Sequence, residues 1–256
     1  MEAQNVTLLV LLDLSAAFDT VRQEILLNRL NSRFGVDGKA LKCFASYLAN
    51  RTQRVTVNDG LSSAFPLRQG VPQGSCLGPL LFTVYASKLF DIVSKHLPYV
   101  HCYADDTQLH LAFSPTALGE DEAALNAMPD CIPDLRNWMI EDQLMLNDDK
   151  TELMLIGTRQ HLQKFNLNDI TVSDTIVEMK SVARNLGSWF DRNLDMSFHR
   201  SKQCDSAFYH LQNISRIRWF LSTDTTKAHV HAFATSCVGY WNKLIKIFNM
   251  ACKLLT

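Results

Sequence analysis

Short aliphatic runs that end at acidic residues are a prominent pattern in the first half of the chain. Residues 6–12 are almost continuously apolar, which is typical of a strand buried on both faces, and the run stops at Asp13. Residues 99–103 and 107–113 are two short runs rich in strand-forming residues, separated only by Ala-Asp-Asp. We therefore expect a buried strand that ends in an acid, and a hairpin with two acids at its tip.

Apolar positions at helical spacing alternate with further strand patterns along the chain. Helices are predicted after Thr20 as N-cap, over residues 39–48 and 80–93, over 120–144 with breaks near Pro129 and Pro133, and over 198–218 and 223–240. Strands are predicted over residues 54–58, with a turn at Asp59 and Gly60, and over 152–156, 170–177 and 185–190. Mixed strands and helices thus precede helices alone, and this order predicts an α+β body followed by an α-helical module.

The composition is globular, and its charge is unevenly distributed. The chain has 256 residues, of which 47% are hydrophobic and 20% charged, and its net charge is -1. Residues 196–256 hold eight Lys or Arg and two Asp, a balance of +6, so the preceding 195 residues carry -7. This asymmetry predicts contact with a polyanion at the C-terminal end. A solvated helical face is the alternative.

Cysteine spacing and hydropathy bear on the compartment. The seven cysteines are irregularly spaced and form no Cys-x-x-Cys pair, so neither a disulfide framework nor a zinc site is indicated. The N-terminus has no basic segment typical of a signal peptide, and no stretch approaches the ~20 apolar residues that cross a bilayer. We therefore expect an intracellular protein, nuclear or cytoplasmic, that is neither secreted nor bound to a membrane.

Adjacent acids at a hairpin tip are unusual because their charges repel. A divalent cation relieves the repulsion, and Mg²⁺ prefers carboxylate oxygens. If the strand that ends at Asp13 pairs beside the hairpin, Asp13, Asp105 and Asp106 converge. Three such acids can hold two ions ~3.5–4 Å apart, the arrangement for in-line phosphoryl displacement. A strand-end or capping acid at Asp13 and a solvated turn at the hairpin tip are the alternatives, but neither explains why both features occur together.

Five longer segments carry recognisable patterns. They are residues 11–21 (Leu-Leu-Asp-Leu-Ser-Ala-Ala-Phe-Asp-Thr-Val), 68–82 (Arg-Gln-Gly-Val-Pro-Gln-Gly-Ser-Cys-Leu-Gly-Pro-Leu-Leu-Phe), 103–109 (Tyr-Ala-Asp-Asp-Thr-Gln-Leu), 144–152 (Leu-Met-Leu-Asn-Asp-Asp-Lys-Thr-Glu) and 185–191 (Asn-Leu-Gly-Ser-Trp-Phe-Asp). In this order they resemble motifs A to E of the reverse transcriptases of LINE-type, non-LTR retrotransposons. A lone Tyr-Ala-Asp-Asp is weak evidence, whereas five motifs in family order and spacing are specific.

The resemblance implies a fold and a division into domains. It covers roughly residues 6–235. The implied fold is the right-hand palm of a polymerase, an antiparallel sheet backed by helices, over residues 1–194. A partial α-helical thumb would follow over residues 195–256.

The resemblance also implies a metal site. Asp13 and Asp105 would be the principal ligands of two Mg²⁺ ions, for which Mn²⁺ can substitute, with Asp106 beside them. Lys150 matches the motif D lysine, a general acid or charge partner for the pyrophosphate leaving group. An exposed lysine beside a strand is the alternative reading of Lys150.

Further positions match nucleotide contacts of the family. The backbone carbonyl of Leu14 would face a metal, and Phe18 matches the steric-gate position, where a ring selects deoxynucleotides. Core packing is the alternative role for Phe18. Gln73 and Gly74 match the motif B loop under the incoming nucleotide and template base, where glycine permits close backbone approach. A plain loop rich in Pro and Gly is the alternative there.

Two groups of residues match primer and nucleic-acid contacts. Asn185, Leu186 and Gly187 match the primer-grip turn, and a tight hairpin at Gly187 is the alternative. Arg216 and Arg218 lie on a predicted basic helix that could contact duplex phosphates, or they are solvated charges.

The implied activity is RNA-directed DNA polymerisation, a two-metal nucleotidyl transfer from dNTPs to a DNA primer on an RNA template. A catalytically inactive retrotransposon remnant that folds and binds nucleic acid is the second hypothesis. Only five residues precede residue 6, where the family has a fingers region, and residues 237–242 depart from the family's thumb sequence. On these grounds we expect a domain that lacks the fingers and is truncated in the thumb. A two-metal nuclease is a third hypothesis, which the matches at Phe18, Gln73 and Gly74 disfavour.

Overall fold

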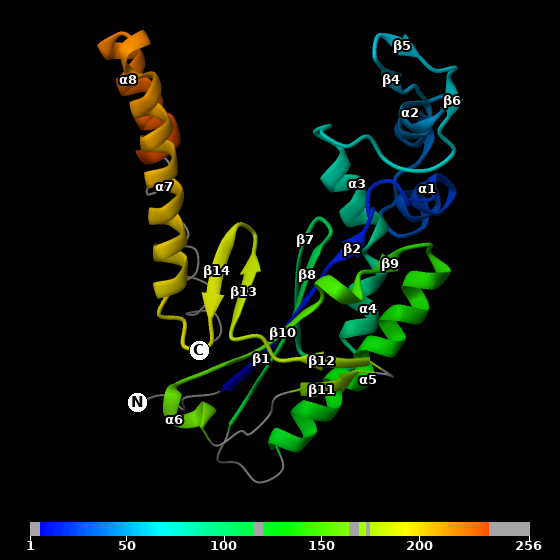
Figure 1. Ribbon diagram of the computed structural model, residues 1–256. Coiled ribbons are helices and arrows are strands. Elements are labelled where there is room, and N and C mark those ends of the chain that lie inside the picture. Colours follow the sequence, from blue (N-terminus) through cyan, green and yellow to red (C-terminus); the bar gives the residue numbers. More distant parts are fainter. Residues whose placement is uncertain (1–5, 115–119, 164–168, 173–174, 236–256) are drawn as a thin grey trace. The chain divides into compact units, whose positions relative to one another are not determined.

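The computed structural model describes residues 6–114, 120–163, 169–172 and 175–235 (Figure 1). The chain divides into two compact units, one that ends at Lys180 and one that begins at Ser181. Within the described residues, no helix is both long enough and apolar enough to cross a bilayer. The cysteines described, at positions 43, 76, 102, 131 and 204, are free thiols.

A four-stranded antiparallel sheet forms the centre of the first unit, in the order β10-β1-β8-β7. β1 (Val6–Leu12) lies between β10 (Glu152–Ile156) and β8 (Asp106–Phe113), and β8 pairs in turn with β7 (Tyr99–Tyr103). The aliphatic run predicts burial on both faces, but the structure shows it fully on only one: the even-numbered side chains of β1 are almost fully buried, whereas Thr7 and Leu9 are partly exposed. The expected strand beside the hairpin is therefore confirmed.

Five helices contribute side chains to the core of the first unit. They are α1 (Gln23–Ser32), α2 (Gly38–Leu48), α3 (Gly78–Tyr85), α4 (Lys88–Val93) and α5 (Glu120–Glu141). α4 packs against β7, α5 packs against β8, and the two helices contact each other on the same side of the sheet (Figure 1). The largest fully buried side chains include Tyr85, Phe82, Leu8, Leu109 and Met139. The opposite face of the sheet is left for the acidic residues described below.

The first unit also contains small two-stranded sheets. They pair β2 (Leu14–Ser15) with β9 (Met145–Leu146), β3 (Thr52–Gln53) with β6 (Phe65–Pro66), β4 (Thr56–Val57) with β5 (Gly60–Leu61), and β11 (Asp169–Val172) with β12 (Thr175–Glu178). A 3₁₀ turn, η1 (Asp148–Lys150), follows β9, and α6 (Arg159–Leu162) follows β10. The β2–β9 pair is important for the site because it continues the chain directly beyond Asp13.

The second unit joins a hairpin to helices. β13 (Val182–Asn185) and β14 (Ser188–Asp191) are followed by α7 (Ser197–Ile217), η2 (Arg218–Phe220), α8 (Thr223–His229) and the π-helical turn η3 (Val230–Thr235). The Asp191 carboxylate accepts hydrogen bonds from the backbone N–H groups of Asn193, Asp195 and Met196, at 3.1, 3.1 and 2.9 Å. Buried His199 accepts one from Trp189 N–H at 3.2 Å, so α7 is tied to the hairpin before it.

The structure confirms the predicted α+β class but corrects several details. The predicted helix of residues 120–144 runs through Pro129 and Pro133 as the single helix α5. Each proline costs an interior helix about 3 kcal/mol. The buried side chains of Met128, Leu135 and Trp138 offset this cost by packing into the core.

Helix ends and turns were less predictable. Thr20 is not the N-cap of α1, because its hydroxyl turns back to the carbonyls of Ala16 and Ala17, both at 3.3 Å, and the helix starts at Gln23. The predicted helix of residues 80–93 is divided into α3 and α4. The predicted turn at Asp59 and Gly60 lies one residue earlier, since Asn58 and Asp59 have the positive φ angles.

Two further predictions concern the C-terminal half. The predicted strand of residues 185–190 is wrong: Leu186 and Gly187, with φ of +46° and +81°, form the turn between β13 and β14. Both positive values suit a two-residue hairpin turn. The compact units meet after Lys180, so this hairpin groups with α7, whereas the predicted domain boundary lies after residue 194. The thumb departures at residues 237–242 and the last residues of the predicted helix 223–240 lie outside the described residues.

A buried polar network ties α1, α3 and the end of α5 together. The Arg29 guanidinium donates to the Tyr85 carbonyl and to the Asp142 carboxylate, and its carbon lies 5.2 Å from the centre of the Tyr85 ring. The Tyr85 hydroxyl donates to the Asp142 carbonyl. The exposed fractions of the Arg29 and Asp142 side chains are 12% and 8%, so the ion pair is largely withdrawn from water.

Breaking this pair is expected to destabilise the fold strongly. Arg29→Ala or Asp142→Ala leaves the other charge buried without its partner, and we expect each to lower the free energy of unfolding by ~3–5 kcal/mol. Urea denaturation of the purified variants measures this.

The matched control is the exposed pair Arg33–Asp91, whose side chains are 39% and 55% exposed. Arg33→Ala is expected to cost less than ~1 kcal/mol because water screens the pair. Equal losses for the buried and the exposed pair would contradict this account of the network.

Candidate active site

The pairing of β1 with β8 brings two acids together. Leu12 pairs with Thr107, and both are buried on the helix-covered face at 3% and 4% exposure. Side chains alternate between the faces of a sheet. The next positions along the two strands, Asp13 and Asp106, therefore lie side by side on the opposite face.

The hairpin tip differs slightly from the prediction. Tyr103 pairs with Asp106, so only Ala104 and Asp105 lie between the two strands and Asp106 is the first residue of β8. Ala104 has a φ of +54°, which is uncommon for a residue with a side chain and concentrates backbone strain at the tip. Asp106 is thus held by the sheet, whereas Asp105 belongs to the turn.

The electrostatics of these acids favour a cation. Burial raises the pKa of Asp106 above its ordinary value, and the nearby negative charges of Asp105 and Asp13 raise it further. The Oδ2 atom of Asp13 is buried and has no hydrogen-bond partner among the residues that the structure describes. It lies 3.5 Å from Nζ of Lys150, an ion-pair contact with a side chain that is 69% exposed. A buried acceptor without a hydrogen bond is costly, so it marks a place where a ligand would be favourable.

The donor chemistry fits a hard divalent cation. Asp13, Asp105 and Asp106 offer carboxylate oxygens alone, the ligands that Mg²⁺ prefers. Among the described residues, no group of three or more His, Cys, Asp or Glu side chains is already gathered at metal-binding distance. Like charges without a cation repel, so we expect the carboxylates to draw closer when an ion binds between them.

Lys150 reaches Asp13 because of an irregularity between neighbouring strands. Leu11 pairs with Glu152, whereas Leu14 pairs with Leu146. The segment from Leu146 to Glu152 therefore advances six positions while the segment opposite it, from Leu11 to Leu14, advances three. The extra residues form η1, which carries Lys150. The backbone N–H of Asn147 donates to the Asp13 carbonyl at 2.9 Å and anchors this turn beside the acid.

A second anchor holds η1 from the side of α5. Arg136 donates two hydrogen bonds to the Asp148 carboxylate, one of them at 3.1 Å. Bidentate pairing of this kind fixes orientation as well as distance. Arg136 and Asp148 therefore help to place Lys150, although the sequence pattern singled out neither as a site residue.

The motif B loop is fastened to the segment that follows β2. The backbone N–H groups of Gly70 and Val71 donate to the carbonyls of Val21 and Phe18, both at 2.8 Å. Gly70 has a φ of +86°, and a Cβ atom there would lie 3.1 Å from the backbone oxygen of Asp19. Glycine is therefore required at Gly70 by both its φ angle and the close approach of Asp19.

The predicted nucleotide-contact residues occupy this loop and the segment beneath it. Gln73 donates from Nε2 to the Asp19 carboxylate at 3.1 Å, and Gly74 has a φ of +73° with open space where a Cβ would lie. Phe18 packs against Phe82 with ring centres 5.3 Å apart, so core packing accounts for part of its role. Leu14 is buried in β2. Asp19 was missed by sequence reasoning, although it stands within motif A.

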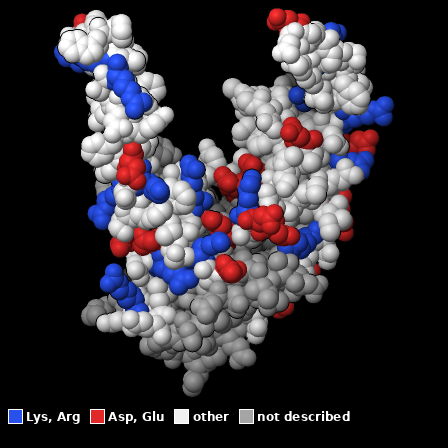
Figure 2. Space-filling view, viewed as in Figure 1, with Lys and Arg blue, Asp and Glu red and all other residues white. Residues whose placement is uncertain are grey.

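The predicted primer and nucleic-acid contacts lie in the second unit. Asn185, Leu186 and Gly187 form the tip of the β13–β14 hairpin. Arg216 is exposed in the last turn of α7. Arg218 was predicted as the last residue of this helix, but α7 ends at Ile217, and Arg218 is exposed in η2, where it donates to the Leu221 carbonyl at 3.0 Å. Figure 2 shows basic side chains exposed along the α7 arm.

Because the pKa of Asp106 is raised in the folded protein, the free energy of unfolding should depend on pH. A carboxyl whose pKa is higher in the folded state favours folding when protonated, and this contribution is lost as pH rises through the folded pKa. We expect Asp106→Asn to raise the unfolding temperature of the metal-free protein at neutral pH. The gain should shrink at acidic pH, below the ordinary pKa of an aspartate. Thermal unfolding in a chelating buffer measures both.

Asp130→Asn, an exposed acid on α5, is the matched control and should change little. Added Mg²⁺ should stabilise the wild type more than Asp106→Asn, because a cation neutralises the same repulsion. A loss of stability for Asp106→Asn at neutral pH without metal would contradict the proposed repulsion.

Comparisons with known proteins agree with the motif pattern. The family model described as reverse transcriptase (RNA-dependent DNA polymerase) matches residues 1–190. The chain is 27% identical over 252 residues to the probable RNA-directed DNA polymerase from transposon BS of Drosophila melanogaster, covering 95% of this chain and 26% of that protein. It is 26% identical over 227 residues to the RNA-directed DNA polymerase from mobile element jockey of the same organism, covering 87% of this chain and 23% of that protein. The chain thus spans about a quarter of the length of these relatives.

Two solved telomerase structures show weaker likeness. Apo telomerase from Candida tropicalis, truncated from its C-terminal domain, has a TM-score of 0.49 and 16% identity, over 76% of this chain and 36% of that one. Telomerase from Candida albicans, in complex with a fragment of telomeric RNA, has a TM-score of 0.44 and 12% identity, over 96% of this chain and 40% of that one. Both scores lie below 0.5, so the family assignment depends on the family model and the mobile-element relatives. The chain belongs to the reverse transcriptase (RNA-dependent DNA polymerase) family, with the LINE-type resemblance that its motifs predict.

Proposed function

We propose that this chain supplies the catalytic palm of an RNA-directed DNA polymerase. The reaction would join a dNTP to the 3′-hydroxyl of a DNA primer paired with an RNA template. The observation that carries the proposal is the placement of Asp13 beside Asp106, with the Asp13 Oδ2 atom buried and without a hydrogen bond. Family membership supplies the class of reaction.

The acids would hold divalent metal ions. Asp13, Asp105 and Asp106 are the proposed ligands of two Mg²⁺ ions, for which Mn²⁺ can substitute. When bound, such ions neutralise developing charge on the attacking and leaving oxygens of a phosphoryl transfer. The sheet contributes by holding Asp13 and Asp106 in fixed register, so that little reorganisation is needed as charge develops.

Lys150 is proposed to act on the leaving group. Its ammonium lies 3.5 Å from the Asp13 carboxylate and is mostly exposed, so it can swing toward a pyrophosphate while staying near the acids. It can donate a proton there or remain as a charge partner. The hydrogen bonds of Asn147 and Asp148 would keep η1 close to Asp13 while the Lys150 side chain moves.

The nucleotide contacts are proposed from the loop geometry. Phe18, packed on Phe82, is the proposed steric gate, and the Leu14 carbonyl is a proposed metal contact. Gln73 and Gly74 are proposed to lie under the incoming nucleotide. The contact of Gln73 with Asp19 would orient its amide before the nucleotide arrives.

The second unit is proposed to hold the nucleic acid. The hairpin tip at Asn185, Leu186 and Gly187 is the proposed primer grip, and Arg216 and Arg218 are proposed phosphate contacts. In family terms, residues 1–194 would form the palm and residues 195–256 part of the thumb. Action inside the cell, in the nucleus or the cytoplasm, is proposed from the retrotransposon resemblance of the motifs.

Primer extension on poly(rA) with an oligo(dT) primer tests the polymerase proposal. With Mg²⁺ or Mn²⁺, the wild type is expected to extend the primer. Asp13→Asn and Asp105→Ala should each lower the rate at least ~100-fold, because metal stabilisation of the transition state is worth several kcal/mol.

Asp130→Asn serves as the control for removal of an exposed acid elsewhere, and it should extend the primer as the wild type does. Equal background from the wild type and Asp105→Ala would overturn the polymerase proposal for this chain. Such a result would favour the inactive remnant.

A further inference from the structure

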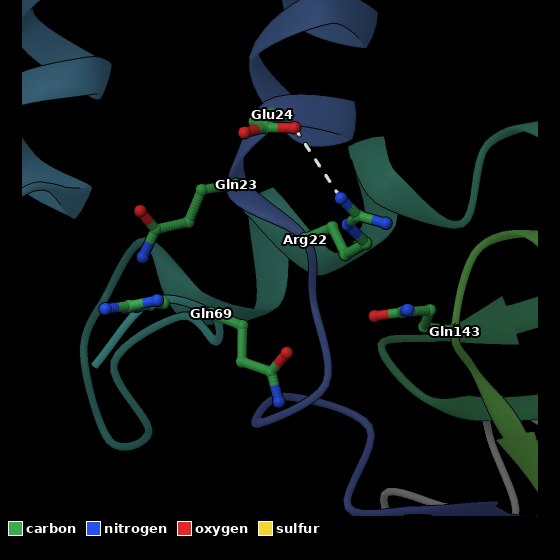
Figure 3. A pocket seen from close by; sticks show the side chains of 6 residues that line it. Arg22, Gln23, Glu24, Gln69 and Gln143 are labelled. Atoms are coloured by element: carbon green, nitrogen blue, oxygen red, sulfur yellow. Dashed lines mark ion pairs between the residues drawn. The ribbon is translucent and has the colours of Figure 1, made fainter. Parts of the chain in front are cut away.

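A polar pocket of about 420 Å³ opens at the N-terminal end of α1 (Figure 3). Three segments far apart in the sequence form it: the start of α1, the start of the motif B loop and the residue after Asp142. Its lining residues are Arg22, Gln23, Glu24, Arg68, Gln69 and Gln143. None of them belongs to the proposed metal site, and no role in the proposed chemistry depends on them.

The walls of the pocket are fastened to one another by buried groups. The Tyr85 hydroxyl accepts a hydrogen bond from the Arg22 N–H at 3.4 Å and donates one to the Asp142 carbonyl. Gly70 N–H donates to the Val21 carbonyl at 2.8 Å and joins the motif B loop to the entry of α1. Tyr85 is fully buried, so these links are shielded from water. The pocket is therefore formed before any ligand binds.

Gln143 is presented from the opposite wall. It has a φ of +57°, an uncommon conformation for a residue with a side chain. The buried Asp142–Arg29 pair before it and the Leu144 N–H, which donates to the Met139 carbonyl at 2.7 Å, hold it there. Figure 3 shows the Gln143 side chain facing Arg22 and Gln69 across the pocket.

The side chains around the pocket match those that bind phosphate. Arg22 and Arg68 bring two positive charges, and the glutamine amides bring neutral N–H donors. Within the described part of the chain, the buried Nε2 atom of Gln23 has no hydrogen-bond partner, so this donor can bind an acceptor on a ligand. No described side chain caps α1, and the positive end of its dipole adds to the attraction for an anion.

Glu24 is the one acid in the lining. Its side chain is 89% exposed, and its carboxylate lies 3.6 Å from the Arg22 guanidinium. With two arginines and one glutamate, the lining carries a net charge of +1. Glu24 therefore weakens, but does not cancel, the attraction for a phosphate.

We propose that this pocket binds a phosphate group of a nucleic-acid strand. The assignment of the phosphate to a nucleic-acid strand rests on the proposed function, whereas the affinity for phosphate rests on the residues of the pocket alone. The contact would position the strand without reading its bases, because phosphate contacts carry no sequence information. Arg22, Arg68 and the Gln23 amide are the principal binding groups.

Fluorescence anisotropy with a labelled single-stranded RNA tests this proposal on the full chain. Arg68→Gln and Gln23→Leu should weaken binding by ~3- to 10-fold, and Arg68→Gln should make the salt dependence shallower by ~0.7 in log–log slope. Glu24→Gln should tighten binding, because it removes the opposing charge. Opposite signs at neighbouring positions cannot come from misfolding. Arg159→Gln, a change in α6, is the matched control for loss of one positive charge and should leave the affinity unchanged.

The outcomes separate this proposal from the polymerase proposal. Asp105→Ala should abolish primer extension and leave the RNA affinity and its response to the pocket variants unchanged. Pocket effects without any extension by the wild type would support the pocket and sink the polymerase activity. Extension with no change in affinity among the pocket variants would sink the pocket. The variants could also change how well inorganic phosphate competes while they bind RNA with the same affinity as the wild type. That result would overturn the assignment of the phosphate to a nucleic-acid strand.

Discussion

The antiparallel register of β1 against β8 is the constraint on which the candidate active site depends. Because Leu12 pairs with Thr107 on the buried face, Asp13 and Asp106 meet on the other face. A slip of one residue would turn an acid into the core, and the aliphatic residues of β1 prevent it by their burial. The hydrophobic core thus holds two like charges together that would otherwise separate, and the energy needed for this comes from packing.

The surrounding contacts hold the segments that flank these acids. Asn147 binds the Asp13 carbonyl, and the Arg136–Asp148 pair orients η1, which carries Lys150. The Arg29, Tyr85 and Asp142 network connects α1, α3 and the end of α5. The same network fixes two walls of the polar pocket. One buried tyrosine therefore couples the stability of the first unit to the shape of a proposed phosphate site.

Much of the fold follows from local patterns, and the misses have physical causes. The aliphatic run of β1 and the two halves of the β7–β8 hairpin were predictable because strand burial leaves a clear pattern. Pro129 and Pro133 predicted breaks in α5 that packing overrides. Thr20 resembles an N-cap, but its hydroxyl bonds to the preceding turn instead. Local sequence cannot report such choices, since they depend on what the rest of the chain offers.

The acids of the candidate site were predictable, but their supports were not. The motif pattern identified Asp13, Asp105 and Asp106, whereas only the register shows that Asp106 stands in the sheet beside Asp13. Asp19 and Asp142 act through partners distant in the sequence: Gln73 is 54 positions from Asp19, and Arg29 is 113 from Asp142. No periodicity or spacing rule connects such pairs. The pocket is a similar case, because its three wall segments come together only in the folded chain.

The end of β1 and the start of β8 are expected to form a divalent-metal site. Mn²⁺ binding, followed by electron paramagnetic resonance of the free ion, tests this in the wild type, Asp13→Asn and Asp130→Asn. The wild type and Asp130→Asn should bind Mn²⁺ saturably, and Asp13→Asn should bind it at least ~10-fold more weakly. Equal Mn²⁺ affinity in all three proteins would contradict this expectation.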